Sequence, residues 1–149
     1  MSKLESTLVG VAGEYLVAGE LSRRGYIASI SLRNSRGIDI IASNNSGERS
    51  ISIQVKTNSS GSKQWMLNKK SEDFFSDNHF YIFVILKQPH ERPDYYIVPS
   101  TVVASTIKKE HREWLNGVGR SGKAHKDTPI RQFADKNDLY LEKWDLLSI

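Results

Sequence analysis

The segment of residues 37–57 constrains the fold more than any other part of the chain. Within it, residues 37–43 and 50–57 alternate apolar and polar side chains, and the sequence Asn44-Asn45-Ser46-Gly47 separates them. This pattern predicts two antiparallel strands joined by a tight turn. The two strands would lie side by side, with their side chains alternating between the two faces of a sheet.

The alternation places three polar side chains on one face of this hairpin, close to its open end: Asp39, Gln54 and Lys56. The opposite face of the second strand carries Ile51 and Ile53, which are typical of a buried surface. The hairpin therefore predicts a group of polar residues at one end of a sheet.

The rest of the chain predicts one α/β domain over residues 1–149, because no repeat, linker or low-complexity segment interrupts it. Helices are expected at residues 8–24, 70–76 and 102–115. Further strands are expected at residues 26–32, 80–87 and 95–98, with a short strand or packing anchor at 65–67. A Gly-rich basic loop is expected at 116–128, followed by an aromatic and leucine-rich tail.

The first predicted helix has a broad apolar face. Its members are Leu8, Val11, Ala12, Tyr15, Leu16 and Ala18. Glu14 falls at the edge of this face, so its carboxylate is expected on the core side. Glu20 and Arg24 lie four residues apart on the polar side, where they could pair in water. Gly10, Gly13 and Gly19 weaken the helix, which suggests a close approach to a neighbouring sheet.

Positive charge is concentrated in two stretches. The chain carries 21 Lys and Arg against 17 Asp and Glu, and the window of residues 107–126 alone holds six bases and two acids, which accounts for the net charge of +4. Residues 56–70 contain four lysines and no acid. Together the two stretches predict a phosphate-binding surface, whereas either one alone is also typical of a solvated face.

Composition excludes several classes of protein. The chain has no cysteine, which rules out disulfides, thiolate metal sites and cysteine nucleophiles. It shows no secretory signal and no stretch that is long and apolar enough to span a membrane, so a cytoplasmic location is expected.

The polar group at the hairpin has the chemistry of phosphodiester hydrolysis with a metal ion. Glu14 and Asp39 would supply carboxylate ligands of the kind that Mg²⁺ prefers. Lys56 lies two residues after Gln54 on the same strand, and it could orient the attacking water or stabilise charge on the phosphate. These residues therefore predict one metal-dependent site.

At these residues the sequence resembles the PD-(D/E)XK nuclease superfamily, which includes restriction enzymes, Holliday-junction resolvases and some homing endonucleases. Gly13-Glu14 resembles the early helical glutamate of that superfamily, Gly37-Ile38-Asp39 its metal-binding aspartate, and Gln54-Val55-Lys56 its (D/E)-X-K element. The resemblance extends in order and spacing over residues 4–98.

This resemblance implies a restriction-endonuclease-like core, with a central mixed sheet of about four to five strands flanked by helices in the order helix, three strands, helix, strand. It implies an endonuclease that cleaves DNA with Mg²⁺ or Mn²⁺. Glu14, Asp39, Gln54 and the backbone carbonyl of Val55 would bind the metal, and Lys56 would assist catalysis. Many members act as dimers or larger assemblies, so a homo-oligomer, a dimer or a tetramer, is compatible with it.

The sequence departs from the superfamily at two positions. Ile38 replaces the proline of the motif, which carries no chemistry. Gln54 stands where an acid is usual, although superfamily members with a Q-X-K element are known to be active. Gln54 removes one negative charge, so weaker ion binding or a single ion is expected. The alternative is a catalytically silent relative that binds nucleic acid or a partner protein.

Other motifs carry less weight. The residues from Gly117 to Lys123 have the spacing of a phosphate-binding loop, but Ala124 replaces the Ser or Thr that would hold Mg²⁺. A basic loop that contacts DNA phosphate is the better interpretation. The candidate phosphate contacts are Lys63, Lys69, Lys70, Arg120 and Lys123. All three tryptophans, Trp65, Trp114 and Trp144, are expected to lie in the core.

Overall fold

A computed structural model describes residues 3–32 and 37–149. The described elements run, in chain order, as α1 (Ser6–Arg23), β1 (Ile27–Ile30), β2 (Ile40–Ser43), β3 (Ser50–Asn58), β4 (Gln64–Asn68), the 3-10 turn η1 (Lys69–Glu72), β5 (His79–Ile85), β6 (Asp94–Pro99), α2 (Ser100–Leu115), β7 (Ile130–Ala134) and the 3-10 turn η2 (Trp144–Leu147). Residues 1, 2 and 33–36 of the predicted domain lie outside the described part, and the single domain stays a prediction.

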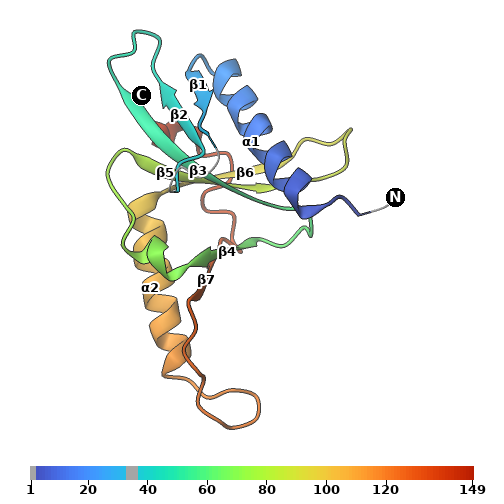
Figure 1. Ribbon diagram of the computed structural model, residues 1–149, viewed down its shortest axis with the longest axis vertical. Helices are drawn as coiled ribbons and strands as arrows, with labels where there is room; N and C mark the ends of the chain where they lie inside the picture. Colours follow the sequence, from blue (N-terminus) through green and yellow to red (C-terminus); the bar gives the residue numbers. More distant parts are fainter. Residues whose placement is uncertain (1–2, 33–36) are drawn as a thin grey trace.

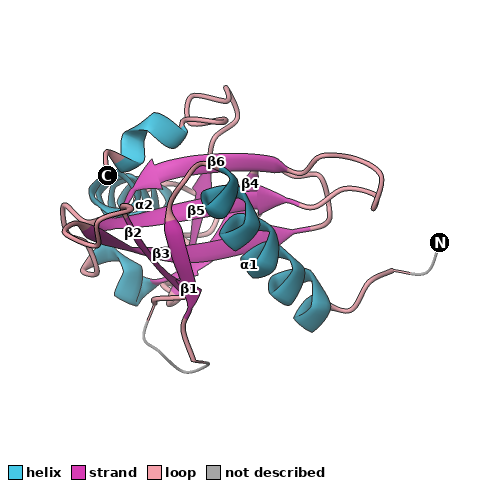
Figure 2. Cartoon of the chain, turned by 90° about the horizontal axis from the view of Figure 1, so that it is seen from above, coloured by secondary structure: helices cyan, strands magenta, loops and turns pink. Residues whose placement is uncertain are grey.

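A five-stranded mixed sheet forms the centre of the fold, in the order β1-β2-β3-β5-β6 (Figure 2). Only β3 and β5 run parallel, and the other neighbours are antiparallel. The predicted turn between β2 and β3 is present, since Gly47 N donates to Asn44 O at 3.0 Å and Gly47 has a φ of 76°. The predicted mixed sheet flanked by helices is confirmed.

The sheet separates two apolar clusters. On one face, strand side chains such as Ile82 pack against α1 and η2, where Trp144 is buried. On the other face, Tyr81 and Phe83 pack against α2 and the two-stranded sheet formed by β4 and β7. Figure 1 shows these two layers, with α1 at the top of the view and α2 with β7 at the bottom.

The buried face of α1 differs from the predicted one. The buried residues are Val9, Gly13, Val17, Glu20 and Leu21. Leu8 and Tyr15, which were expected in the core, are 51% and 66% exposed. The reason is Gly13, because a Cβ built there would overlap the Thr57 hydroxyl of β3. The helix therefore turns its glycine to the sheet. The close approach predicted from the glycines is confirmed at Gly13, whereas a Cβ built on Gly10 or Gly19 would meet no atom of another segment within 4 Å.

The predicted surface pair of Glu20 and Arg24 is wrong. Glu20 is only 5% exposed and forms ion pairs with Arg92, from the β5–β6 connection, and with Arg23 at 3.6 Å. Arg24 instead pairs with Glu142 at 3.6 Å and lies over the Trp144 ring at 4.4 Å. A buried carboxylate on α1 is tolerated because distant parts of the chain bring arginine to it.

Two segments after β3 differ from the prediction. The helix expected at residues 70–76 is the four-residue turn η1. Strand β7 was not predicted, and it pairs with β4 in the register Leu67–Arg131. The long second helix is α2, which follows β6. In the described part of the chain, no helix has the length and apolar character needed to cross a membrane.

Candidate active site

Strand β3 extends further than β2, its neighbour on one edge. Its antiparallel register with β2 extends only as far as Ile40–Ile53. On its other edge, β3 pairs with β5 as far as Asn58–Ile85. We call the β2-side edge of residues 54–58 the fork. The four predicted site residues all belong to elements that meet at this fork.

Asp39 is fixed at the fork by the backbone of β3. Its amide donates to Ile53 O at 2.8 Å, and its carboxylate oxygen Oδ2 accepts from Val55 N at 2.7 Å. The carboxylate thus takes the place of a strand partner. In an antiparallel strand, the N–H and C=O of one residue point to the same edge. The Val55 carbonyl therefore also points into the fork.

The environment of Asp39 is partly buried. Burial raises the pKa of the Asp39 carboxyl above its usual value, and the hydrogen bond from Val55 N and the charge of Lys56 offset only part of this rise. The structure therefore brings Lys56 within electrostatic range of Asp39. Lys56 itself is half-buried.

Gln54 lies opposite Asp39 in the continued register of β2 and β3, so the two residues share a face. Its side chain is directed toward Gly37, because a Cβ built on Gly37 would lie 3.4 Å from Gln54 Oε1. Gly37 has a φ of 61°, a conformation that favours glycine. The absence of a side chain at residue 37 leaves room for the amide of Gln54.

Glu14 reaches the same end of β3 from α1. Its neighbour Gly13 packs directly on Thr57, the residue after Lys56. Glu14 is half-buried, as expected for the edge of the buried face. The close contact at Gly13 thus places the backbone of Glu14 beside Thr57, at the end of β3 that forms the fork.

The oxygen donors at the fork suit a hard divalent ion. They comprise the Asp39 carboxylate, the amide oxygen of Gln54 and the carbonyl of Val55. Glu14, next to Gly13 on α1, is the carboxylate that the sequence predicts as a further ligand. No group of three His, Cys, Asp or Glu side chains that could hold a metal occurs among residues 3–32 and 37–149. A metal would therefore depend on the neutral oxygens of Gln54 and Val55, with water completing its coordination.

A supporting layer beside Gln54 was not predicted. Ser52, two residues before Gln54, hydrogen-bonds through Oγ to His79 Nδ1 at 2.7 Å. The His79 ring meets the Phe74 ring edge-on at 4.7 Å, and Phe74 in turn lies against Gly37. Burial lowers the pKa of His79. The alternation of Ser52 with Gln54 and Lys56 was the available signal, but it did not identify a partner on β5.

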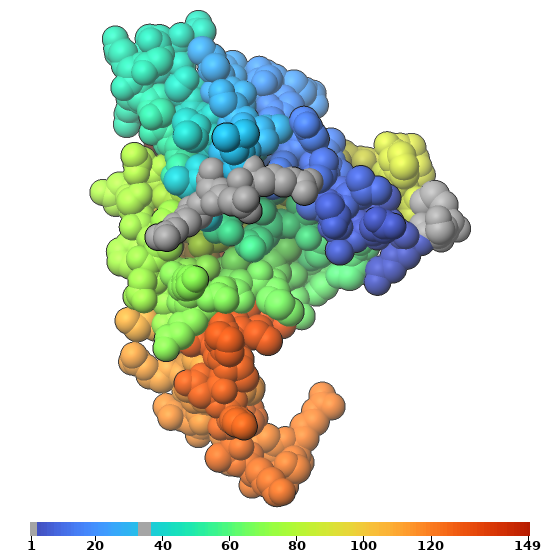
Figure 3. Space-filling view, viewed as in Figure 1, coloured from blue at the N-terminus to red at the C-terminus, as the bar shows by residue number. Residues whose placement is uncertain are grey.

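The predicted phosphate contacts lie on the α2 side of the molecule. Lys63 pairs with Asp138 at 2.9 Å, whereas Lys69 and Lys70 on η1 are exposed. Lys69 N donates to Pro129 O at 2.8 Å, so the end of the first basic stretch lies beside the segment that follows the second. Arg120 and Lys123 are exposed in the loop of residues 116–128, which projects at the lower end of Figure 3. Their contact with nucleic acid stays a prediction.

Comparison with solved structures places the fold. A bacterial homing endonuclease, I-Ssp6803I, has a TM-score of 0.58 and 14% identity, covering 98% of this chain and 94% of that chain. The chain has the restriction-endonuclease-like fold. The Holliday junction resolvase Hjc from Archaeoglobus fulgidus is also similar, with a TM-score of 0.48, 14% identity and coverage of 85% of this chain and 84% of that chain. Both structural neighbours are nucleases of the PD-(D/E)XK type. No protein-family model and no curated protein matches the sequence.

Proposed function

We propose that this chain is a metal-dependent endonuclease that hydrolyses DNA phosphodiester bonds at the fork. The observation that carries the proposal is the placement of Asp39, whose carboxylate is held by Val55 N and lies within range of the charge of Lys56. This arrangement occurs in a restriction-endonuclease-like fold, at the positions where the sequence resembles the PD-(D/E)XK motif.

The proposed metal ligands are Glu14, Asp39, Gln54 Oε1 and the Val55 carbonyl. Bound there, Mg²⁺ or Mn²⁺ would polarise the scissile phosphate and make a bound water more acidic. Lys56 projects from β3 beside these ligands, where its ammonium group can orient the attacking water and stabilise the developing negative charge. The hydrogen bond from Val55 N keeps the Asp39 carboxylate in a fixed orientation before any ion binds.

The direct test is a cleavage assay with Mn²⁺ on duplex, single-stranded and branched DNA, and on RNA. We expect wild type to cut at least one DNA substrate and Lys56→Ala to lose activity by about 100-fold or more, as for removal of one charge-stabilising group. Lys143→Ala is the matched control, because Lys143 is an exposed lysine outside both basic stretches. Thermal unfolding checks that each variant is folded. Equal inactivity of wild type and Lys56→Ala on every substrate, together with no gain in thermal stability from Mn²⁺, would contradict the proposal.

One observation favours a second candidate, a catalytically silent nuclease-like module that binds nucleic acid or a protein. Because Gln54 replaces the acid that is usual in the superfamily, the proposed site has two carboxylates and not three. The loss of one negative charge weakens the electrostatic attraction for a divalent ion. Differential scanning calorimetry separates the two candidates. An active enzyme is expected to gain thermal stability from Mn²⁺, and Asp39→Ala should remove that gain, whereas a silent module gains nothing in either form.

An endonuclease with a strict sequence preference, such as a homing or restriction enzyme, is a variant of the first candidate. Such an enzyme would look inactive on random DNA. It would still bind Mn²⁺ at the fork, so the same calorimetric measurement identifies it. The homo-oligomer and the cytoplasmic location stay predictions that accompany the proposed function. Gel filtration with light scattering measures the first of these.

A further inference from the structure

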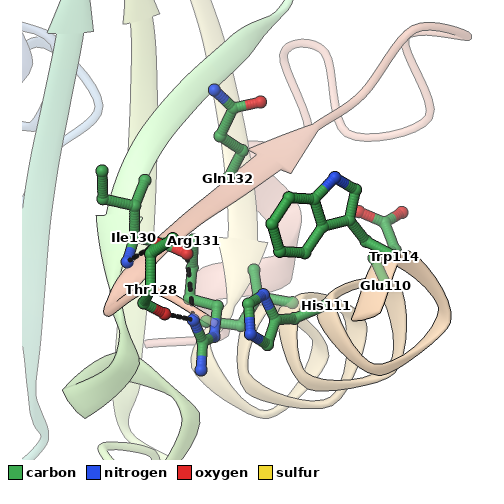
Figure 4. Close-up of a pocket in the computed structure, with 8 residues that line it drawn as sticks. Glu110, His111, Trp114, Thr128, Ile130, Arg131 and Gln132 are labelled. Atoms are coloured by element: carbon green, nitrogen blue, oxygen red, sulfur yellow. Dashed lines mark hydrogen bonds between the residues drawn. The ribbon is translucent and has the colours of Figure 1, made fainter. Parts of the chain in front are cut away.

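A cavity of about 450 Å³ lies between α2 and β7, and it shares no lining residue with the candidate active site (Figure 4). Its size falls within the range of about 300–1,000 Å³ that is typical of ligand sites. Its two walls come from segments that also carry or adjoin the basic stretches. The cavity therefore lies beside both basic stretches.

One wall is a single face of α2. Ile107, Glu110, His111 and Trp114 line it at helical spacing. Trp114 is 43% exposed, in contrast to Trp65 and Trp144, which are 4% and 5% exposed. The prediction of a core Trp114 is therefore wrong. The ring centroids of His111 and His125 lie 5.5 and 4.1 Å from the centroid of the indole ring. These contacts fix the orientation of the Trp114 side chain, while part of its surface stays open.

The other wall is the start of β7. Figure 4 shows the Trp114 indole reaching from α2 toward β7, with Ile130 on the far side and the Gln132 amide above. Ile130 is 51% exposed, so two large apolar groups border the cavity without covering each other. Gln132 and Glu110 add hydrogen-bonding groups at its edge, and burial together with Glu113 raises the pKa of Glu110. An apolar slot with polar edges suits a flat heterocycle.

The floor of the cavity is rigid. Arg131, whose side chain is 4% exposed, pairs with Glu72 of η1 at 2.5 Å and donates to Thr128 O at 2.7 Å. A buried ion pair of this kind fixes the end of β7 against η1. The slot is thus largely formed before any ligand enters, which lowers the entropic cost of binding.

The exposed cations around the cavity indicate the chemistry of its ligand. Arg120, Lys123 and Lys126 lie in the loop that joins the two walls, and Lys69 and Lys70 lie on η1, next to Pro129. Such a density of exposed cations attracts a phosphate backbone. Stacking on an aromatic side chain accepts any base, because every base has a π-face. A nucleic-acid strand satisfies both the cationic rim and the apolar slot.

We infer that the cavity between Trp114 and Ile130 binds one unstacked nucleobase of a DNA strand whose phosphates lie along the cations of η1 and the 116–128 loop. The inference rests on the proposed function for its partner, DNA, but it does not depend on cleavage. It assigns the α2–β7 layer a role in holding single-stranded or distorted DNA.

The test is a binding assay in EDTA, so that cleavage does not enter. Fluorescence anisotropy compares an oligonucleotide of about 12 thymidines with an abasic backbone of the same length, a size within the usual range for single-strand sites. We expect wild type to prefer the thymidine strand by about tenfold, the value of one stacked base. Tryptophan emission should be quenched on binding, and the buried Trp65 and Trp144 leave Trp114 as the accessible reporter.

The variants separate stacking from charge. Trp114→Ala should abolish the preference and the quenching while leaving affinity for the abasic strand unchanged, and Trp114→Phe should restore part of the preference. Leu139→Ala, which removes another exposed apolar side chain (66% exposed), is the matched control and should behave as wild type. Circular dichroism confirms folding.

Two outcomes would overturn the inference. The first is an equal affinity of wild type for the thymidine and the abasic strand. The second is an equal affinity for thymidine monophosphate and for the thymidine strand, which would make a free nucleotide the ligand. Neither outcome bears on the nuclease proposal, which the loss of cleavage in Lys56→Ala tests separately.

Discussion

The fork and the α2–β7 layer place their polar residues in opposite ways. At the fork, Asp39, Gln54 and Lys56 are half-buried and positioned by strand register and by a hydrogen bond from the backbone to Asp39. In the α2–β7 layer, Arg120 and Lys123 are exposed on a loop. Chemistry at one phosphate requires side chains held to a fraction of an ångström. Attraction of a long polyanion requires only charge density, which a loop can supply.

The largest expected effect tests how closely the fork is packed. Gly13→Ala places a Cβ onto the Thr57 hydroxyl, so we expect a loss of about 1–3 kcal/mol in the free energy of unfolding, the usual cost of overpacking. Gly10→Ala and Gly19→Ala are matched controls, because a Cβ at either position meets nothing within 4 Å. These controls should gain about 0.5–1 kcal/mol from helix propensity. Urea unfolding measures all three, and a stabilised Gly13→Ala would show that α1 does not rest on β3.

The charge deficit at the fork gives the next effect. Gln54→Glu restores a third carboxylate, so we expect the Mn²⁺ concentration for half-maximal stabilisation to fall by about tenfold, a gain of about 1.4 kcal/mol. Gln132→Glu, on the exposed side of β7, adds the same charge away from the fork and is the control. Calorimetric titration with Mn²⁺ measures the change. Unaltered ion affinity in Gln54→Glu would mean that residue 54 is not a ligand.

The supporting layer beside Gln54 gives a pH dependence. Burial lowers the pKa of His79 below the unfolded value of 6.5, so the unfolded chain binds a proton before the folded one does. Stability from this residue is therefore present above pH 6.5 and falls as the pH drops below that value, by at most about 1.4 kcal/mol per pH unit. Urea unfolding at several pH values should show this slope in wild type, and a shallower one in His79→Gln. An identical slope in the variant would assign the effect to other groups.

The smallest effect belongs to the α2–β7 layer. Arg120→Ala and Lys123→Ala should each reduce the salt dependence of DNA binding by roughly one ion, and weaken affinity similarly for all sequences. Lys143→Ala again serves as the control. Anisotropy titrations over a range of salt concentrations give the slopes. If Lys56→Ala reduced the slope as much as these loop variants do, the division between a chemical and a binding region would fail.

Sequence periodicity was sufficient for the strands of the fork. Residues 50–57 alternate cleanly, and β3 spans Ser50–Asn58 with Ile51 and Ile53 in the core, as predicted. Periodicity did not predict which face of α1 is buried, because apolar residues occur on several sides of that helix. The residue that decides the orientation is Gly13, which has no side chain. A pattern of apolar side chains cannot predict a contact that depends on the absence of a side chain.

Contacts between segments that are distant in the chain could not be predicted from the sequence either. β7 is a five-residue strand that pairs with β4, and Glu20 is buried because Arg92 reaches it. Each of these features is set by residues that are far apart in the chain, whereas local pattern reports on neighbours. The binding roles predicted for Lys69, Lys70, Arg120 and Lys123 await experiment.

The burial of η2 has a consequence for the order of folding. Trp144 and Leu147 pack in the same apolar cluster as α1, β2 and β3, so one core joins segments that are more than 100 residues apart in the sequence. Contacts of such long sequence separation form slowly, because the chain must lose loop-closure entropy before they are made. The α1 side of the sheet, which supports the fork, should therefore complete its packing late in folding, when η2 docks.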